Sequence, residues 1–167
     1  MVMIRIADFN DLESINEIYN QAVDSRNSTA DLDFISLSER EVWFREHNEH
    51  KYPVFVYEMD NKVVGWLSVS PYRKGRRALD EVVEVSYYIH NDYQRRGIGT
   101  ELMKYILYNA RTYNISHIVC ILLEINSGSI KLLEKFGFEK WALLPDIVDL
   151  DGKICSHLYM GLSIKNS

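Results

Sequence analysis

The stretch "YQRRGIGTELM", Tyr93 to Met103, decides the fold of this chain, because a glycine turn here joins a strand-like segment to a helix-like one. Upstream, "EVVEVSYYIH" (81–90) alternates as strands do. Downstream, apolar residues recur at helical spacing, at Leu102, Met103, Ile106, Leu107, Ala110 and Tyr113. A helix N-terminus leaves backbone N–H groups unpaired and carries partial positive charge. The turn is therefore suited to holding a pyrophosphate, and the glycines let it approach the backbone.

Spacing alone also allows a second interpretation of this turn, in which the glycines only connect a strand to an ordinary helix. The stretch lacks the lysine of a Walker loop and the third glycine of the dinucleotide fingerprint, so neither of those nucleotide sites fits. The rest of the chain is needed to choose between a ligand site and a plain turn.

The whole chain has the size and composition of one globular domain. It has 167 residues, and 47% of them are hydrophobic, which is enough to bury a core. We expect a single domain over residues 1–167, because no repeat, linker or low-complexity tract interrupts it. A net charge of −5 gives no long-range attraction to nucleic acid, and the basic run 73–77 is typical of a solvated turn rather than a nucleic-acid patch.

The cysteines and the N-terminus indicate a cytoplasmic protein without a membrane segment. Cys120 lies in the apolar run "HIVCILL" and is expected to be a core thiol, and it shares no CxxC spacing with Cys155. The N-terminal apolar stretch is broken at once by Arg5 and Asp8, so it predicts neither a signal peptide nor a span. No later segment reaches spanning length.

The remaining pattern predicts the element order β-α-α-β-β-β-α-β-α-β-β. Two capping-box patterns, Asn10 with Glu13 and Ser36 with Glu39, are expected to open the first two helices. Asp60-Asn61 predicts a hairpin, and Gly137 predicts the end of the last helix. The order predicts an α+β (mixed α/β) domain with antiparallel hairpins first and one parallel crossover later.

The chain resembles the GCN5-related N-acetyltransferases, the GNAT family, whose acyl-CoA signature is Gln/Arg-x-x-Gly-x-Gly/Ala. Gln94, Gly97 and Gly99 match that signature, and the element order is similar to that fold over nearly the full chain. The resemblance implies a mostly antiparallel twisted sheet flanked by helices, with acetyl-CoA as cosubstrate and no metal.

Four further motifs resemble one branch of this family, the phosphinothricin and methionine sulfoximine acetyltransferases. They are "IYNQAV" (18–23), Tyr72-Arg73, "VEVSYYIH" (83–90), and Asn126 followed by Gly137-Phe138. Relatives are commonly homodimers, so the resemblance also implies a dimer.

The resemblance assigns roles to individual residues. It implies that the main chain of Tyr87, Tyr88 and Ile89 holds the pantetheine arm and the acetyl carbonyl. It implies contacts from Asn126 and from Ser129 to the pantetheine end. The pyrophosphate would be cradled by Arg95, Arg96, Gly97, Ile98, Gly99 and Thr100.

Glu84 is the residue expected to carry acid–base chemistry. Alternation puts Glu84, Ser86, Tyr88 and His90 on one face of the strand, which by itself is also compatible with an exposed glutamate. The resemblance aligns Glu84 with the proposed base of the branch. An amine attacks a thioester only when unprotonated, so a base must take its proton, and burial should raise the pKa of Glu84 toward that task.

The expected substrate-binding residues lie before and within the same strand. Arg73 and Lys74 resemble the substrate-binding segment of the branch, which implies that they hold a carboxylate. Tyr72 and Ser86 would line the pocket beside Glu84, and the polar loop around Thr29 would form its other side. A solvated loop is the alternative for Arg73 and Lys74. His47 and His50 are three residues apart on a predicted helix, but no third ligand is in reach, so surface positions are favoured over a metal site.

One departure from the family leaves the general acid open. Many acetyltransferases carry a tyrosine in the last helix, where this chain has Leu133. The leading hypothesis is transfer of acetyl from acetyl-CoA to a small amino-acid-like amine in a ternary complex. Two alternatives remain: an acetyltransferase of a protein N-terminus, lysine or polyamine, and a CoA-binding sensor without turnover.

Overall fold

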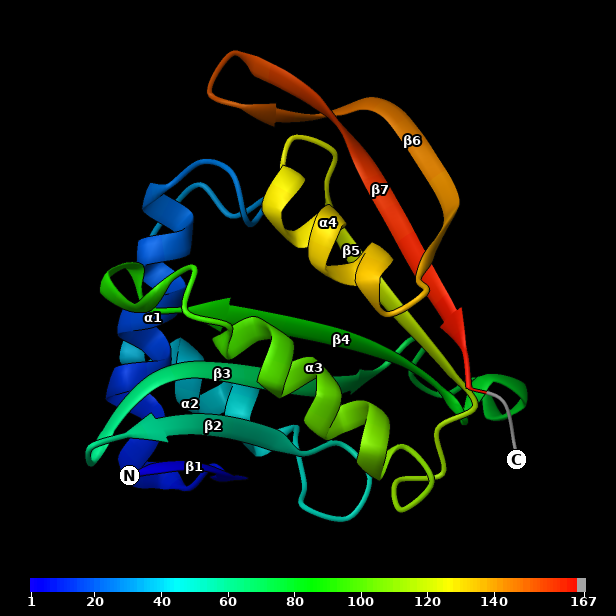
Figure 1. The fold of residues 1–167 in the computed structure, drawn as a ribbon. Coiled ribbons are helices and arrows are strands. Elements are labelled where there is room, and N and C mark those ends of the chain that lie inside the picture. The colour runs from blue at the N-terminus through cyan, green and yellow to red at the C-terminus, as the bar shows by residue number, and fades with distance from the viewer. Residues whose placement is uncertain (165–167) are drawn as a thin grey trace.

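Seven strands form one mixed sheet in the order β1-β2-β3-β4-β5-β7-β6 in the computed structural model, which describes residues 1–164 (Figure 1). The strands are β1 (Val2–Ile6), β2 (Val54–Met59), β3 (Lys62–Pro71), β4 (Val82–Ile89), β5 (His117–Leu123), β6 (Glu139–Leu150) and β7 (Lys153–Ser163). The helices are α1 (Leu12–Asp24), α2 (Leu37–Arg45), α3 (Ile98–Asn109) and α4 (Ser127–Lys135). The predicted element order and fold class are confirmed.

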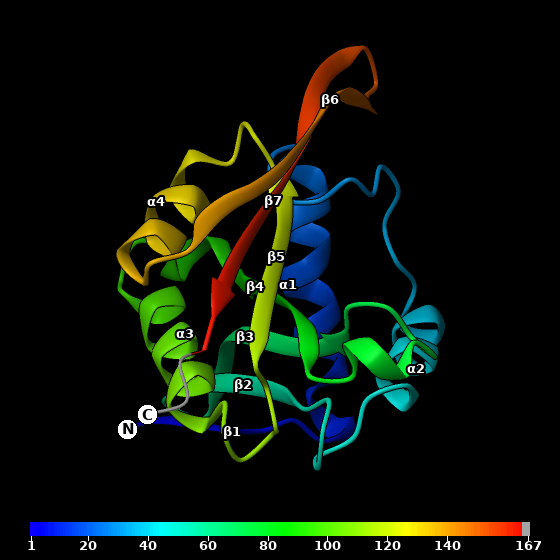
Figure 2. The same cartoon turned by 90° about the vertical axis from the view of Figure 1, so that its right-hand side faces the viewer.

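The helices cover both faces of the sheet, with α3 and α4 on one side and α1 and α2 on the other (Figure 2). The larger hydrophobic cluster joins α3 to the sheet through side chains such as Val83, Val85 and Ile106. A second cluster packs α1 against β2 and β3 around Ile15 and Trp66. Residues alternating along β3 and β4 therefore face two different layers of the molecule.

The one parallel pairing, between β4 and β5, is short. Its paired residues are Val82↔His117, Val83↔Ile118 and Glu84↔Val119. Beyond Glu84 the two strands are no longer paired, and they separate in Figure 1. Backbone groups of the second half of β4 on the β5 side consequently have no strand partner, and the opening between the strands is available for a ligand.

The helix starts differ from the sequence prediction at one place. The Asn10–Glu13 capping box is wrong: Asp8 caps a short 3₁₀ helix (Phe9–Asp11) reciprocally with Asp11, and α1 follows directly. The Asp11 carboxylate, which completes this capping box, also binds the Arg5 guanidinium at 2.7 Å, and this ion pair stabilises the Asp8 cap. The Ser36–Glu39 capping box at the start of α2 is confirmed.

The predicted placement of His47 and His50 on a helix is also wrong, because α2 ends at Arg45. His47 is half-buried and lies within hydrogen-bonding distance of the Trp43 carbonyl and the Ser70 hydroxyl, whereas His50 is exposed. Within residues 1–164 no group of three or more His, Cys, Asp or Glu side chains is placed to hold a metal ion.

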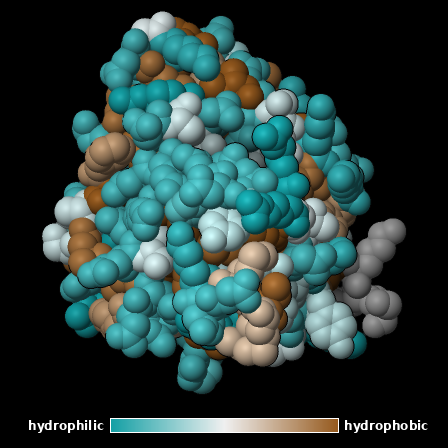
Figure 3. All heavy atoms as spheres, turned by 60° about the vertical axis from the view of Figure 1, so that its left-hand side comes forward, coloured by the Kyte–Doolittle hydropathy of each residue, from teal (hydrophilic) through white to brown (hydrophobic). Residues whose placement is uncertain are grey.

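The outer strand β6 is the most exposed element of the sheet. Apolar side chains at Trp141, Leu143 and Ile147 are 37–58% exposed. On the face seen in Figure 3 hydrophilic groups predominate, and hydrophobic ones appear at the top, where the β6–β7 hairpin lies, and in smaller groups lower on the same face. None of the helices in the described part of the chain has the length and apolar character needed to cross a membrane.

Candidate active site

A cavity of about 520 Å³ lies on the α1–α2 side of the sheet, and we call it the aromatic cavity. Its floor follows from strand register, because antiparallel partners share a face. The β3–β4 pairs that form it are Trp66↔Tyr88, Ser68↔Ser86 and Ser70↔Glu84. Three serines in the middle of this floor occupy little volume, and the large aromatic rings lie at one end, so a hollow remains above the strands.

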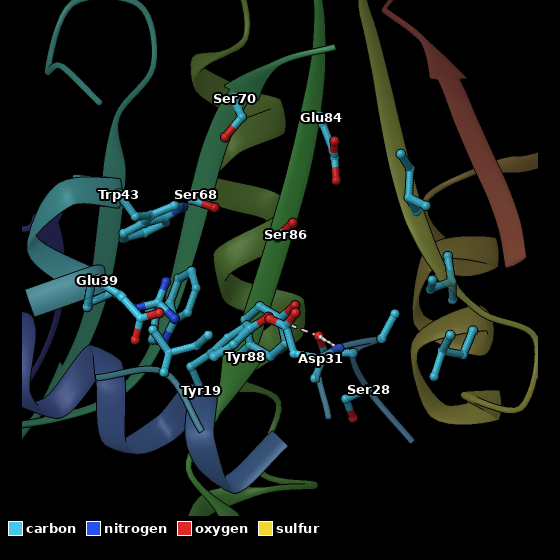
Figure 4. Close-up of a pocket in the computed structure, with 18 of the residues that line it drawn as sticks. Tyr19, Ser28, Asp31, Glu39, Trp43, Ser68, Ser70, Glu84, Ser86 and Tyr88 are labelled. Atoms are coloured by element: carbon cyan, nitrogen blue, oxygen red, sulfur yellow. Dashed lines mark hydrogen bonds between the residues drawn. The ribbon is translucent and has the colours of Figure 1, made fainter. Parts of the chain in front are cut away.

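Glu84 faces this hollow, and its side chain points into the space between β4 and β5 (Figure 4). The side chain is half-buried and makes no hydrogen bond within the described residues. Removal from water disfavours the charged form, so burial raises the pKa of Glu84 above its ordinary value, as the sequence predicted. The exposed alternative for this residue does not hold.

The far wall of the aromatic cavity comes from α1 and the loop that follows it. The Tyr19 hydroxyl donates a hydrogen bond to the Asp31 carboxylate and lies 2.9 Å from the Thr29 hydroxyl. Burial and this carboxylate raise the pKa of Tyr19 to about 12, so the phenol stays protonated at neutral pH. Thr29 thus lines the cavity, where the sequence placed it.

A second cavity, of about 720 Å³, lies on the α3–α4 side, and we call it the glycine groove. Gly97 precedes α3 with φ +83°, a left-handed conformation that glycine adopts without steric cost, and no side chain caps the helix. Gly99 is needed for a different reason: a Cβ there would lie 2.9 Å from the Leu132 side chain of α4. The turn therefore presents free N–H groups to the groove.

Most of the residues predicted to bind the cofactor line this groove. They are Tyr87, Tyr88, Ile89, Arg95, Gly97, Ile98, Gly99, Thr100, Asn126 and Ser129. Arg96 is not among the lining residues, since its guanidinium donates to the Asp92 carbonyl at 2.8 Å and lies over the Tyr93 ring. The Asn126 side chain already accepts a hydrogen bond from the Ser129 N–H as the N-cap of α4.

The two cavities meet where β4 and β5 separate. The residues that line both are Ser28, Ser86, Tyr88, Ile121 and Leu122. A molecule in the glycine groove and one in the aromatic cavity would therefore touch across the edge of β4. This junction lies next to Glu84, two residues from Ser86 along the strand.

The loop residues predicted to bind substrate lie elsewhere. Arg73 and Lys74 are exposed in the β3–β4 connection, and Lys74 pairs with Glu46 at 3.6 Å. Neither they nor Tyr72 line the aromatic cavity. Their role in binding stays a prediction. Ser86, predicted for the same role, lies at the junction.

Buried groups near the junction fit a bound thioester better than a covalent mechanism. Tyr87 lines the glycine groove, and its buried hydroxyl lies beside the Ser129 side chain. Cys120 is also buried there, and burial raises the pKa of its thiol, which disfavours the nucleophilic thiolate. Leu133, in place of the family tyrosine, is 1% exposed and part of the core.

Sequence reasoning missed several residues of the aromatic cavity, above all Arg40. They include Tyr19, Asp31, Arg40, Trp43 and Trp66. Arg40 lies in α2, and its guanidinium carbon lies 4.4 Å from the centroid of the Tyr19 ring and 4.6 Å from that of the Trp43 ring. No sequence pattern indicated this position. The low apolar content of α2 made a buried charge on its inner face unexpected.

Comparison with known proteins identifies the class that this fold and these cavities define. The model of the acetyltransferase (GNAT) family matches residues 12–138, and the chain belongs to this family. It is an acetyl-CoA-dependent N-acetyltransferase, and the glycine groove has the donors and the space that this cosubstrate requires.

Particular relatives are similar over nearly the full chain. YwnH of Bacillus subtilis (strain 168), provisionally named a phosphinothricin acetyltransferase, is 36% identical over 90% of this chain and 91% of its own. The L-methionine sulfoximine/L-methionine sulfone acetyltransferase of Pseudomonas aeruginosa is 28% identical over 96% of this chain and 94% of its own. The structure of the Salmonella typhimurium acetyltransferase yncA with acetyl-CoA has a TM-score of 0.92 at 28% identity and covers all of this chain and 96% of its own.

Proposed function

We propose that the protein moves the acetyl group of acetyl-CoA to the primary amine of a small amino-acid-like compound, of the phosphinothricin or methionine sulfoximine type. The observation that supports this best is the junction of the two cavities beside a half-buried carboxylate. A cosubstrate in the glycine groove and an amine in the aromatic cavity would react there without a covalent enzyme intermediate. The relatives named for these substrates support the substrate class.

Proton removal is the step for which Glu84 is suited. An alkyl ammonium has a pKa of about 10 and an α-amino group one of about 8, so most of the substrate amine is charged at neutral pH. Glu84 takes this proton, directly or through water, and its raised pKa makes it a better base than an ordinary glutamate. The nitrogen then bonds to the acetyl carbon, and the carbon–sulfur bond breaks.

Negative charge develops at two places during the reaction, on the carbonyl oxygen and on the departing sulfur. A backbone N–H in the segment Tyr87–Ile89, on the edge of β4 left unpaired by β5, stabilises the negative charge that grows on the carbonyl oxygen. The departing thiolate needs no dedicated acid, because a thiol with a pKa of roughly 8.5 is a tolerable leaving group.

Acetyl-CoA supplies the activated acetyl thioester when bound. The N-terminus of α3 from Gly97 to Thr100, with Arg95 beside it, would hold the pyrophosphate through N–H groups and charge. Asn126 and Ser129 at the start of α4 would contact the pantetheine end. Arg96 would have to leave the Asp92 carbonyl to join them.

A thiol-release assay with acetyl-CoA tests the proposal. The amines are methionine sulfone, methionine sulfoximine and phosphinothricin, with spermidine and a short peptide with a free N-terminus as comparisons. We expect release of free CoA with the amino-acid-like amines. Release with spermidine or the peptide alone would favour the alternative acceptors, and tight acetyl-CoA binding without release from any amine would make the protein a sensor.

The proposal includes a homodimer in the cytoplasm. The exposed apolar side chains of β6 support a protein contact there, because large apolar surfaces on single subunits commonly mark interfaces. Light scattering after size exclusion tests it: a mass of one chain at micromolar concentration would rule the dimer out.

A further inference from the structure

His47 and Ser70 form a hydrogen-bonded pair beside the aromatic cavity. The His47 Nε2 lies 3.1 Å from the Ser70 hydroxyl, and its Nδ1 lies 2.9 Å from the Trp43 carbonyl. The ring also packs against the Trp43 ring, with 4.4 Å between the two centroids. Ser70 lines the cavity and His47 does not, so the histidine acts on a molecule in the cavity only through the serine.

The two contacts of His47 fix the position of its ring proton. A carbonyl oxygen only accepts hydrogen bonds, so the Nδ1 that faces the Trp43 carbonyl carries the proton. In a neutral imidazole the other nitrogen is then an acceptor, and the Ser70 hydroxyl donates to Nε2. Burial lowers the pKa of His47, which favours this neutral form. The Glu46 carboxylate opposes the shift, but it is paired with Lys74 at 3.6 Å.

This arrangement leaves Ser70 as an acceptor toward the cavity. A serine hydroxyl has one proton to donate and two lone pairs that accept. Because the proton is donated to His47, the lone pairs are what Ser70 presents to a molecule in the cavity. The pair thus offers the cavity an acceptor rather than a donor.

The Ser70 acceptor lies directly across the sheet from Glu84. The register of β3 and β4 pairs the two residues, and both line the aromatic cavity. Opposite residues of an antiparallel pair have Cβ atoms roughly 4.5–5.5 Å apart on one face. Figure 4 shows the two side chains on neighbouring strands, at the end of the cavity away from Tyr19. An ionised carboxylate also only accepts, so two acceptors share this end of the cavity.

Two acceptors at this spacing suit one water molecule. Two O–H···O hydrogen bonds of about 2.8 Å through a single water join oxygens roughly 4.5 Å apart. A bridging water needs polar partners and room, and a cavity of about 520 Å³ provides the room. A water that donates both protons, one to Glu84 and one to Ser70, keeps its lone pairs for the N–H of an amine.

We propose that Ser70, oriented by His47, holds the water through which Glu84 takes the proton of the acceptor amine. This inference rests on the proposed function, which it deepens. The junction at Ser86 lies two residues from Glu84 along β4, about 7 Å at the backbone, which leaves room for a water between nitrogen and carboxylate. An ammonium proton moves to the water oxygen while a water proton moves to Glu84. The water is regenerated, Glu84 ends protonated, and the amine ends neutral.

His47 contributes by setting the direction of the Ser70 hydroxyl. Without an acceptor at position 47, the Ser70 proton is free to turn into the cavity. Donated to the water, it would occupy a lone pair that the amine needs. Donated to Glu84, it would stabilise the charged carboxylate and make it a weaker base. Ser70 and His47 are therefore positioning residues, and Glu84 is the base.

The test measures kcat and KM for methionine sulfone in the wild type and in Ser70→Ala, Ser70→Thr, His47→Phe and His47→Gln. Phenylalanine keeps a ring against Trp43 without the nitrogens, glutamine keeps an acceptor oxygen, and threonine keeps the hydroxyl. We expect Ser70→Ala and His47→Phe to lower kcat about 10-fold at nearly constant KM, because each loses one oriented hydrogen bond. Ser70→Thr and His47→Gln should stay within about 3-fold of the wild type. His50→Phe, the same change at an exposed histidine, is the control and should alter neither constant.

The double variant His47→Phe/Ser70→Ala separates an indirect effect from a direct one. Because His47 acts only through Ser70, we expect its kcat to equal that of Ser70→Ala within about 2-fold. A loss of about 100-fold, the product of the two single losses, would mean that His47 acts independently and would overturn the proposal. Equal losses in His47→Phe and His47→Gln would overturn it as well, since only the first variant lacks the acceptor.

Nitrogen NMR of the wild type with isotope-labelled histidine tests the hydrogen bonds without turnover. The His47 signals are assigned by their absence from the spectrum of His47→Phe. At neutral pH we expect a protonated Nδ1 and an unprotonated Nε2. A proton on Nε2 would make Ser70 the acceptor of this bond and refute the proposal. Failure of the proposed function is a different result, namely the expected tautomer with no acetylation of any amine.

Discussion

The glycine groove and the aromatic cavity meet at one strand edge but are built in opposite ways. The groove contains one continuous segment, the turn 94–100, whose free backbone N–H groups have a direction set by the start of α3. The cavity takes its side chains from α1, the following loop, α2, β3 and β4. A backbone site depends on a local conformation, whereas a side-chain site depends on how distant elements pack.

This difference matches the work that each site has to do. Acetyl-CoA presents the same pyrophosphate in every reaction cycle, so a local turn with fixed geometry is suited to the groove. Acceptor amines differ in size and charge. A site made of side chains from separate elements can be altered by a substitution in one element while the others stay the same. Functional specificity on a common fold resides in such sites.

Glu84→Gln should separate the two sites most clearly. We expect kcat to fall by roughly 10²–10⁴, the usual contribution of a positioned base, while acetyl-CoA affinity stays nearly unchanged because Glu84 does not line the groove. Thiol release gives kcat, and calorimetry gives the affinity. Loss of both quantities to the same extent would mean that the two sites are not independent and that the role of Glu84 is wrong.

The wild-type pH profile provides a second check on the same residue. Its pKa is raised by burial, so kcat/KM should fall as the pH drops through that raised value and the carboxylate becomes protonated. In Glu84→Gln the inflection that belongs to Glu84 should disappear, and only the titration of the substrate amine, at a higher pH, should remain in the profile.

Of the two sites, Gly97→Ala should affect ligand binding only in the glycine groove. A left-handed alanine costs about 1–2 kcal/mol, and relief of this strain would turn the N–H groups away from the phosphate, so we expect acetyl-CoA to bind about 10-fold more weakly. Gly152→Ala is the matched control, because Gly152 also has a positive φ, +95°, with open space around it, in the turn between β6 and β7. Both variants should melt earlier, and weaker acetyl-CoA binding in Gly152→Ala as well would show that general destabilisation is responsible.

Glu84→Gln should also raise stability in the absence of ligands. The folded-state pKa of Glu84 lies above its unfolded value, so its ionisation costs stability at neutral pH and nothing below the unfolded pKa. Removal of the charge should raise the Tm at pH 7, by about 2–4 °C for each kcal/mol relieved, and leave it unchanged near pH 4. Glu139→Gln, at an exposed position of β6, is the control in the same melting series. A lower Tm at pH 7 would contradict the burial of this carboxylate.

The sequence predicted the groove far better than the cavity, for a physical reason. Gly97, Gly99 and the helix after them form a site through local backbone rules, which act over a few residues and can be recognised in one motif. Strand alternation likewise placed Glu84 and Ser86 on a common face, and the structure agrees. Arg40 could not be found this way, since its burial depends on the packing of α2 against α1 and β3.

The differences between the sequence prediction and the structure have a related origin. The resemblance assigns Arg73 to substrate binding, and the structure places it exposed in the loop before β4, so its role stays a prediction. The cap at Asn10 failed because the Arg5–Asp11 ion pair, a contact between a strand and a turn, selects Asp8 instead. Local sequence patterns identify helices and strands, whereas contacts between distant residues determine which of several possible caps and loop directions forms.

Ser36→Ala is the most sensitive test of how the cavity is assembled, although its effect should be small. Loss of the cap costs about 1 kcal/mol and loosens α2, which carries Arg40, so we expect KM for methionine sulfone to rise about 2-fold. Asp8→Ala removes a comparable cap from the 3₁₀ helix before α1, outside both cavities. Both variants should lose about 2–4 °C in Tm, but only Ser36→Ala should change KM, and acetyl-CoA affinity should be unaffected in either. An equal rise of KM in Asp8→Ala would mean that the cavity responds to overall stability rather than to the position of α2.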